Sequence, residues 1–491
     1  MRPIKLAVLA IFLLAMSACS RSTPPPTLEI DPSAPPPPIV SNAQTSETTP
    51  VRGIHQPINF DNRTITIGLL QEGATPFTML PPAHMEPDPA TSENYIRDRL
   101  IWDNARRVEH DFNFTLEEWV SRGSAHFAGQ LRTSVLAGSA ITDLIFAPPN
   151  ILFEAVLGGQ MQPLCQINLP CSDLLGNQFF SRFVAEGFGY AWAFHTTEPD
   201  TSAFTLGVNL DVINAAGAPN PVELYNNNQW TWDAMLNIMR MTTLETAGEQ
   251  TQWGIIGRPC ELLRNFIGAN DGVIVTEDYR FGFDHPNTLE ALEFIETIMG
   301  EQLWMWDTYV TFYGNGGSSM ISRWSDFQSG NFAFKTGLHW SLSSPDDIPF
   351  DFAVIPLPAG PSNTSGSTSG GGWQTGVAFP RAASIEAVHL LMIMEEYFSW
   401  SVNEPERLHD MAITWGRGIV LTEDNAARHV YAATGQRFDM GNNIAAFDNI
   451  LDEMVRYFMP HNDQWRDRRT SVEVIEIYRD QVQRELERIF Q

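Results

Sequence analysis

Apolar and polar residues follow two different periods in the first part of the chain. The runs 63–70 (RTITIGLL) and 143–149 (DLIFAPP) are short and mostly apolar, which is typical of buried strands. Between them, apolar residues recur at helical spacing over 96–112 and 127–136, and residues 112–120 alternate as a further strand. This order of strand, helix, strand, helix and strand predicts parallel βαβ units and therefore an α/β lobe.

The pattern changes at residues 187–217, where two extended apolar runs flank a polar turn and lead into a short helix. We interpret this segment as a crossing of the chain into a second lobe. Helical spacing follows at 231–241 and again at 384–400. Two phrases with the capping-box pattern, 287–290 (NTLE) and 470–473 (TSVE), predict the starts of two more helices.

The stretch 329–380 alternates apolar strands with glycine-rich turns and includes Trp340 and Trp373. A sugar presents apolar C–H faces and many hydroxyls, so a protein that binds one needs aromatic planes for stacking and polar groups for hydrogen bonds. Three glycines precede Trp373 and would let the backbone approach a ligand closely. The stretch therefore predicts part of a carbohydrate-binding cleft, with the tract 365–372 (SGSTSGGG) as a flexible turn.

The N-terminus has the order of a bacterial secretion signal, with two basic residues ahead of the apolar run 6–15. The tetrapeptide 16–19 (MSAC) resembles a bacterial lipobox, in which the cysteine is lipidated. We predict that residues 1–18 are a signal peptide and that lipidated Cys19 is the first residue of the mature chain. An ordinary cleaved signal that happens to be followed by a cysteine is the alternative.

Residues 19–57 are polar and rich in proline, so they lack the apolar content to pack and are expected to form a disordered tether. No later segment has eighteen apolar residues in a row, which leaves the lipid as the predicted membrane attachment. The net charge of −28 argues against nucleic acid as a partner and disfavours docking on an anionic bilayer. The protein is therefore expected outside the cytoplasm, at the cell surface or in the periplasm.

Cysteine usage and motifs give no sign of a metal or of catalysis. In an oxidising compartment, Cys165 and Cys171 would be able to close a local disulfide, which would leave Cys260 unpaired and buried. Three cysteines at these spacings make a poor metal site. The sequence has no His-Glu-x-x-His, no Gly-x-Ser-x-Gly and no phosphate-loop motif. We expect no cofactor and no metal.

Several conspicuous side chains are interpreted as structural. A glycosidase needs two carboxylates that face each other across a bond. Adjacent residues on a strand point to opposite faces, and adjacent residues on a helix diverge by about 100°. The pairs Glu117-Glu118 and Glu395-Glu396 are therefore interpreted as solvated faces. The residues expected to pack or to bond the backbone are Trp230, Trp232, Asp143 and Asn209.

Five phrases in the folded part of the chain carry a family resemblance: 131–149 (LRTSVLAGSAITDLIFAPP), 208–221 (VNLDVINAAGAPNP), 229–236 (QWTWDAML), 329–342 (SGNFAFKTGLHWSL) and 352–361 (FAVIPLPAGP). In this order they resemble the extracellular solute-binding proteins of ABC importers, the family of the maltose-binding protein and other sugar-binding lipoproteins. Leu210, where lysine is usual, and Thr142, where proline is usual, depart from the pattern.

The resemblance implies an α/β fold with two lobes, the periplasmic-binding-protein-like fold of type II, whose ligand cleft lies between lobes joined by hinge strands. Closure of such lobes around a ligand needs new torsions at only a few hinge residues. The implied division after the tether is 58–188 and 355–400 for the two segments of lobe 1, 189–354 for the first segment of lobe 2, and 401–491 for the helical C-terminal tail of lobe 2.

The resemblance also implies a monomer that captures a sugar or oligosaccharide and delivers it to the subunits of a membrane permease, without being an enzyme. Trp340 matches the family's Gly-x-Trp position at the cleft, and Trp373 is expected to approach the ligand from the other lobe. Trp192 in the crossing segment and Glu72 after the first strand complete the predicted ligand-binding set. A receptor for a peptide or another small solute on the same fold is the alternative, followed by a secreted carbohydrate-active enzyme.

Overall fold

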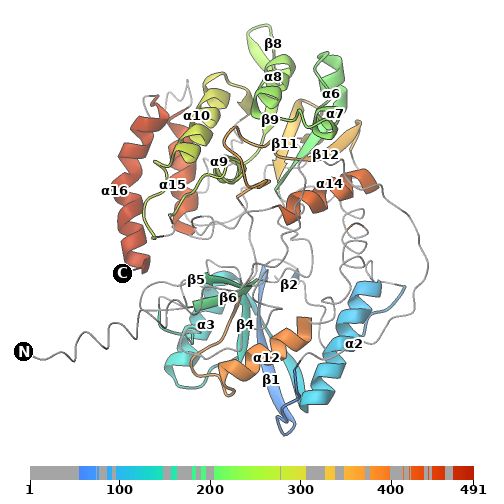
Figure 1. Cartoon of the computed structure of the whole chain (residues 1–491), viewed down its shortest axis with the longest axis vertical. Helices are drawn as coiled ribbons and strands as arrows, with labels where there is room; N and C mark the ends of the chain where they lie inside the picture. Colours follow the sequence, from blue (N-terminus) through green and yellow to red (C-terminus); the bar gives the residue numbers. More distant parts are fainter. Residues whose placement is uncertain are drawn as a thin grey trace, which may run out of the picture. The chain divides into compact units, whose positions relative to one another are not determined.

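The computed structural model describes residues 55–72, 75–76, 86–90, 95–147, 155, 158–162, 180–183, 190–194, 204–276, 278–305, 327–337, 348–370, 376–398, 413, 420, 422–435, 441, 445–458 and 468–490. In this part of the chain the larger strands form two sheets (Figure 1). Each sheet with its helices is one lobe.

The first sheet begins with the predicted parallel units. β1 (Arg63–Glu72) pairs in parallel with β3 (Phe114–Arg122) on one side and β4 (Leu144–Ala147) on the other. α2 (Tyr95–Phe112) connects β1 to β3, and α3 (Ser124–Leu136) connects β3 to β4. The sequence prediction of strand, helix, strand, helix and strand is therefore confirmed.

Antiparallel strands complete this sheet. β13 (Gly376–Ala378) runs between β4 and β6 (Tyr190–Phe194) and is antiparallel to both. β5 (Phe180–Phe183) pairs with β6, and β2 (Thr75–Pro76) pairs with β1. β6 therefore still belongs to the first sheet, although the sequence-based boundary between the lobes was placed at residue 188. The sheets show only which strands belong to each lobe. The exact residues at which the lobes begin and end therefore stay a prediction.

Helices cover both faces of the first sheet. Ile67 in β1 and Phe146 in β4 belong to one buried cluster with residues of α2 and α12 (Ala387–Phe398). Ile145, the neighbour of Phe146, belongs to the cluster that includes Phe127 of α3. Because successive side chains of a strand point to opposite faces, the sheet is buried on both sides, as expected for parallel strands.

The second sheet is mixed. Its strands, in spatial order, are β10 (Trp304–Met305), β9 (Glu249–Ile256), β11 (Phe332–Gly337), β7 (Thr205–Asn209) and β12 (Phe352–Pro356), with β8 (Leu244–Thr246) paired to β9. β9, β10 and β11 are parallel, whereas β7 is antiparallel to its neighbours β11 and β12. β12 thus lies in the second sheet, while the predicted return to lobe 1 was placed at residue 355.

The helices of the second lobe are α6 (Leu210–Ala215), α7 (Pro221–Asn226), α8 (Trp232–Thr242), α9 (Pro259–Gly268), α10 (Pro286–Gly300), α14 (Glu423–Thr434), α15 (Ala445–Arg456) and α16 (Ser471–Phe490). Val354 of β12 packs in a cluster with Val430 of α14, whereas its neighbour Ile355 belongs to the cluster of Met235 in α8. This sheet is therefore also covered on both faces.

The two predicted capping boxes have different outcomes. At α16 the Thr470 amide donates to Glu473 Oε2 (2.9 Å) and the Glu473 amide donates to Thr470 Oγ1 (3.4 Å), so this prediction is confirmed. α10 instead begins at Pro286 after His285, whose side chain makes no capping bond. The predicted box at 287–290 is wrong, because its glutamate bonds elsewhere in the fold.

Candidate functional site

The parallel strands of the first sheet end together at one edge, here called the first carboxyl edge. Glu72 is the last residue of β1 and Ala147 is the last residue of β4. β13 begins at this edge, since Gly376 pairs both with Ala147 and with Phe194, the last residue of β6. Ligands of open α/β sheets bind outside the carboxyl ends of the strands, so this edge is the candidate ligand-facing part of the first lobe.

Two of the predicted ligand residues belong to strands that end at the first carboxyl edge. Glu72 ends β1, and Trp192 lies two positions before the end of β6, opposite Ser181 of β5. For both residues the structure describes the backbone alone. Trp373 lies outside the described residues, three positions before Gly376. A ligand role for these three residues stays a prediction.

The second sheet has a corresponding second carboxyl edge. Near the ends of β9, β10 and β11, Ile256 pairs with both Met305 and Lys335, so the three strands finish together. Gly337 is the last residue of β11. Trp340 lies outside the described residues, three positions after Gly337, and its ligand role stays a prediction.

Charged side chains gather near the second carboxyl edge. Lys335 is fully buried, and its Nζ donates to the carbonyl of the next residue at 3.1 Å. Arg258, at the start of α9, pairs with Asp452 of α15 at 3.4 Å. Burial raises the pKa of the nearby Glu261 carboxyl, although the positive charges of Arg258, Arg264 and Lys335 oppose the rise.

These charged residues were given no role in the sequence analysis. The one available signal was a lysine inside an apolar strand, 332–337 (FAFKTG), in a chain whose other lysine belongs to the predicted signal peptide. A buried lysine needs partners because the desolvation of its charge is costly. Its position at the edge where β11 ends makes it part of the candidate region.

The cysteines divide between the described and the undescribed parts. Cys260 is buried and unpaired, as predicted, and its backbone amide donates to Asp452 Oδ1 at 3.0 Å. Burial raises the pKa of its thiol well above the ordinary value, which makes it unreactive. Cys19, Cys165 and Cys171 lie outside the described residues, so lipidation and the local disulfide stay predictions.

Two tryptophans are packing residues, as the sequence indicated. Trp230 Nε1 donates to the carbonyl of Pro356 at 3.0 Å, and Trp232 Nε1 donates to the carbonyl of Pro358 at 3.1 Å. Trp232 also stacks on Phe294, with 4.5 Å between ring centroids. Both indoles are buried with their N–H groups satisfied, which is how buried tryptophans are usually accommodated.

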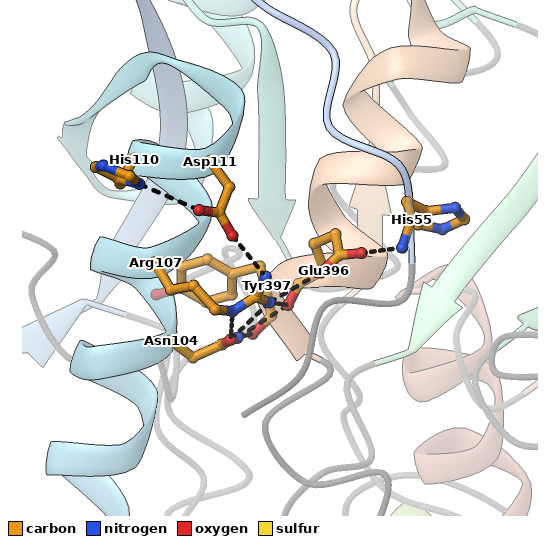
Figure 2. Close-up of polar contacts among 7 residues, drawn as sticks. All are labelled: His55, Asn104, Arg107, His110, Asp111, Glu396 and Tyr397. Atoms are coloured by element: carbon orange, nitrogen blue, oxygen red, sulfur yellow. Dashed lines mark hydrogen bonds and ion pairs between the residues drawn. The ribbon is translucent and has the colours of Figure 1, made fainter. Parts of the chain in front are cut away.

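Glu396 corrects the interpretation of the second acidic pair as a solvated face. Its side chain is fully buried because α12 packs on α2, and it forms an ion pair with Arg107 Nη2 at 2.8 Å (Figure 2). The backbone amide of His55 donates to its other oxygen. Asn104 donates to the carbonyls of Glu396 (2.9 Å) and Tyr397 (2.6 Å). Glu396 is therefore a structural residue, while Glu117 is exposed as expected.

Two polar residues bond the backbone as predicted. Asp143 accepts the Thr66 amide at 3.0 Å and the Ser384 hydroxyl at 2.7 Å. Asn209 caps α6 by accepting the Val212 amide at 3.1 Å.

The tract 365–370 was expected to be flexible, and this expectation is wrong. Ser367, Thr368 and Ser369 are buried, and Thr368 Oγ1 donates to the carbonyl of Ala432 at 2.6 Å. Residues 371 and 372 lie outside the described part of the chain.

Among the described residues, no group of three or more histidines, cysteines, aspartates or glutamates is arranged to hold a metal ion. None of the helices in that part of the chain is long and apolar enough to span a membrane.

No protein-family model and no curated protein sequence matches this chain. Solved structures do resemble it. The sugar-binding protein MalE from Xanthomonas citri has a TM-score of 0.55 at 14% identity, covering 87% of this chain and 99% of that chain. An ABC substrate-binding protein from Listeria monocytogenes, solved in complex with cycloalternan, has a TM-score of 0.51 at 13% identity, covering 87% of this chain and 100% of that chain. The chain therefore has the two-lobed α/β fold of periplasmic binding proteins.

Proposed function

We propose that this chain is the extracytoplasmic solute-binding protein of an ABC importer, which captures a sugar or oligosaccharide and delivers it to the membrane permease. The observation that carries the proposal is that each of the two sheets has a carboxyl edge next to which a predicted aromatic residue stands in the sequence. Similarity in fold to a sugar-binding protein and to a protein solved with cycloalternan supports it.

The proposed ligand residues are divided between the lobes. Trp340 follows the last strand residue of β11 in the second lobe, whereas Trp373 precedes β13 in the first. Trp192 and Glu72 belong to the first carboxyl edge. Stacking of indoles on the apolar faces of a sugar, with a carboxylate accepting from hydroxyls, is the chemistry that such a set supplies. No bond is broken in this function.

The proposal also covers how the protein is attached to the membrane and how it meets the permease. A lipid on Cys19 would hold the chain at the membrane, and the polar, proline-rich residues before His55 would separate the folded lobes from the bilayer. The permease subunits would contact exposed surfaces of both lobes of a monomer. Replacement of Cys19 by alanine in the expressing cell tests the anchor: the protein is expected to leave the membrane fraction, and retention there would remove the lipid from the proposal.

Intrinsic tryptophan fluorescence tests the ligand class. A panel of neutral oligosaccharides is expected to include one that shifts or quenches the emission and raises the thermal midpoint without being consumed. Trp340→Ala and Trp373→Ala should each weaken that binding about tenfold or more, since a stacked aromatic contributes on the order of 1 kcal/mol beyond its buried area. Trp102→Phe is the control, because Trp102 lies on α2 with the Arg106 guanidinium 4.5 Å from its ring centroid and is not among the proposed ligand residues.

The outcomes separate the candidate functions. Saturation by a peptide or a charged solute, with no response to any saccharide, would replace the sugar by the alternative ligand class. Formation of a product from an oligosaccharide would overturn the receptor function. Unchanged affinity in both tryptophan variants would remove these residues from the site.

A further inference from the structure

A single carboxylate after α9 gathers four donors from one loop. Asp271 follows the helix with a φ of 56°, in the left-handed region, where aspartate is one of the better tolerated residues. Its Oδ2 accepts the amides of Thr364 (2.7 Å) and Ser365 (2.9 Å) and the Thr364 hydroxyl (3.1 Å). Its Oδ1 accepts the Ser365 hydroxyl. Hydrogen bonds to an ionised acceptor are stronger than those between neutral groups.

The residue before Asp271 holds the same loop from inside the fold. Asn270 is fully buried, and its Oδ1 accepts the Ser362 amide at 2.9 Å. Its Nδ2 donates to Glu290 Oε2 at 2.9 Å, and Ser362 Oγ donates to the same oxygen at 2.6 Å. Glu290, which the sequence pattern assigned to a capping box, is used here instead.

Both ends of the loop also contact the second lobe. The Gly360 amide donates to the carbonyl of Ala269 at 2.9 Å, and the Thr368 amide donates to the carbonyl of Gly435 at 2.8 Å. A Cβ atom on Gly268 would lie 2.1 Å from the backbone of Gly370, so the chain passes directly against α9 there. Residues 360–370 are therefore held along their length.

Only five residues, 371–375, separate this loop from Gly376, which belongs to the first sheet. We propose that Asn270, Asp271, Glu290 and the loop 360–370 form a clasp that fixes the second-lobe end of this connection and so restrains the two lobes relative to each other. If the clasp opened, residues 362–370 would no longer be fixed to the second lobe, and more conformational entropy would be lost on binding. Asp271 is thus a positioning residue, and its effect on solute affinity rests on the proposed function.

The restraint is measured on the full chain without any ligand. Spin labels on a ketone-bearing unnatural amino acid are placed at the exposed positions 126 in α3 and 245 in β8, which avoids the native cysteines. Asp271→Ala is expected to broaden the distribution of distances between the labels. The matched control is Asp278→Ala, since Asp278 also accepts a hydroxyl, from Thr276 at 2.6 Å, but does not contact the loop.

A second variant tests the clasp with Asp271 still in place, in case Asp271→Ala disturbs the folding of the chain. Thr364→Val combined with Ser365→Ala removes both hydroxyls and leaves the two backbone bonds to Asp271, so it should give an intermediate broadening. Hydrogen exchange at the amides of residues 364 and 365 should be at least about tenfold faster in Asp271→Ala, because these amides open locally.

An unchanged distance distribution in Asp271→Ala would overturn the clasp, and so would equal broadening in Asp278→Ala. Solute affinity is then measured with maltotriose and longer maltooligosaccharides, and about tenfold weaker binding is expected in Asp271→Ala. Broadening together with unaltered affinity would overturn the positioning role. Absence of binding by the unmodified protein to all saccharides, with broadening still seen in the variant, would overturn the proposed sugar function and leave the clasp supported.

Discussion

In each lobe one carboxylate binds another segment of the chain, but the two carboxylates differ in how deeply they are buried. In the first lobe, the fully buried Glu396 binds Arg107 and the amide of His55, where the described chain begins (Figure 2). In the second lobe, Asp271 is partly exposed and takes four donors from Thr364 and Ser365. One contact is a largely buried ion pair, and the other is a set of hydrogen bonds to a partly exposed carboxylate.

The difference predicts different consequences of mutation. Removal of one partner from a buried pair leaves the other charge without compensation, which is among the costlier single changes in a protein. Removal of a partly exposed acceptor lets water replace it, so the loss is smaller and stays local. The first lobe therefore depends on Glu396 for overall stability, whereas the second depends on Asp271 for the order of one loop.

The largest expected effect is on the first lobe. Glu396→Ala should lower the free energy of unfolding by about 3 kcal/mol, because Arg107 would lose its buried partner and keep only the partly exposed Asp111, 3.4 Å away, as an ion pair. Chemical denaturation followed by circular dichroism measures the loss. Glu117→Ala is the control, since Glu117 is exposed on β3 and should change stability by no more than about 0.5 kcal/mol. Equal values for the two variants would contradict the contrast between the lobes.

A buried histidine gives the second lobe its own dependence on pH. Burial lowers the pKa of His429 in α14 to about 4. The unfolded state, with an ordinary histidine pKa of about 6.5, then binds more protons between those values, so the free energy of unfolding should fall as pH falls through this window. The slope from one group is at most about 1.4 kcal/mol per pH unit. Urea titrations from pH 7 to 4 measure it.

His429→Gln should flatten this slope, whereas replacement of the exposed His126 in the first lobe should not. A slope that persists unchanged in His429→Gln would assign the pH dependence to other groups.

A smaller, local effect is expected at the clasp. Burial alone would raise the pKa of Asp271, but hydrogen bonds from Ser365 and Thr364 outweigh burial and hold its pKa below the ordinary value. The clasp's contribution is therefore complete above pH about 4 and is lost as pH falls through the lower folded pKa. Amide chemical shifts of residues 364 and 365 should report this transition. A midpoint above pH 4 would contradict the prediction.

The smallest expected effect is a local change in hydrogen exchange, which should differ between the two predicted capping boxes. Glu473→Ala should speed hydrogen exchange in the first turn of α16, because Glu473 accepts the Thr470 amide. Glu290→Ala should leave the first turn of α10 unchanged and speed exchange at the Ser362 amide, since Glu290 supports Asn270 and the Ser362 hydroxyl. Faster exchange at the start of α10 would restore a capping role for Glu290.

Local periodicity was sufficient for much of the fold. The parallel units of the first lobe and the start of α16 follow from spacing and from a motif whose partners are three residues apart. The same motif failed at 287–290 because Glu290 finds partners at Asn270 and Ser362, which no local pattern contains. Local signals therefore predicted elements better than they predicted the use of individual polar side chains.

The conspicuous side chains, inside and outside the candidate site, show the same limit. Trp230 and Trp232 were assigned to packing from their place at a helix start, and their buried N–H groups agree. Glu396 was taken for a solvated residue because its partner Arg107 lies 289 positions away in the sequence. Lys335 was left without a role, since burial at a strand end depends on the whole sheet. Trp340 and Trp373 stay predictions.

Calorimetric titration of the full chain with neutral oligosaccharides tests the receptor function most directly. The expected result is saturable binding of one saccharide per chain with no product formed, and a marked loss of affinity both in Trp340→Ala and in Trp373→Ala, because each lobe would contribute one stacking ring. The absence of saturable binding for every saccharide, or turnover of the one that binds, would contradict it.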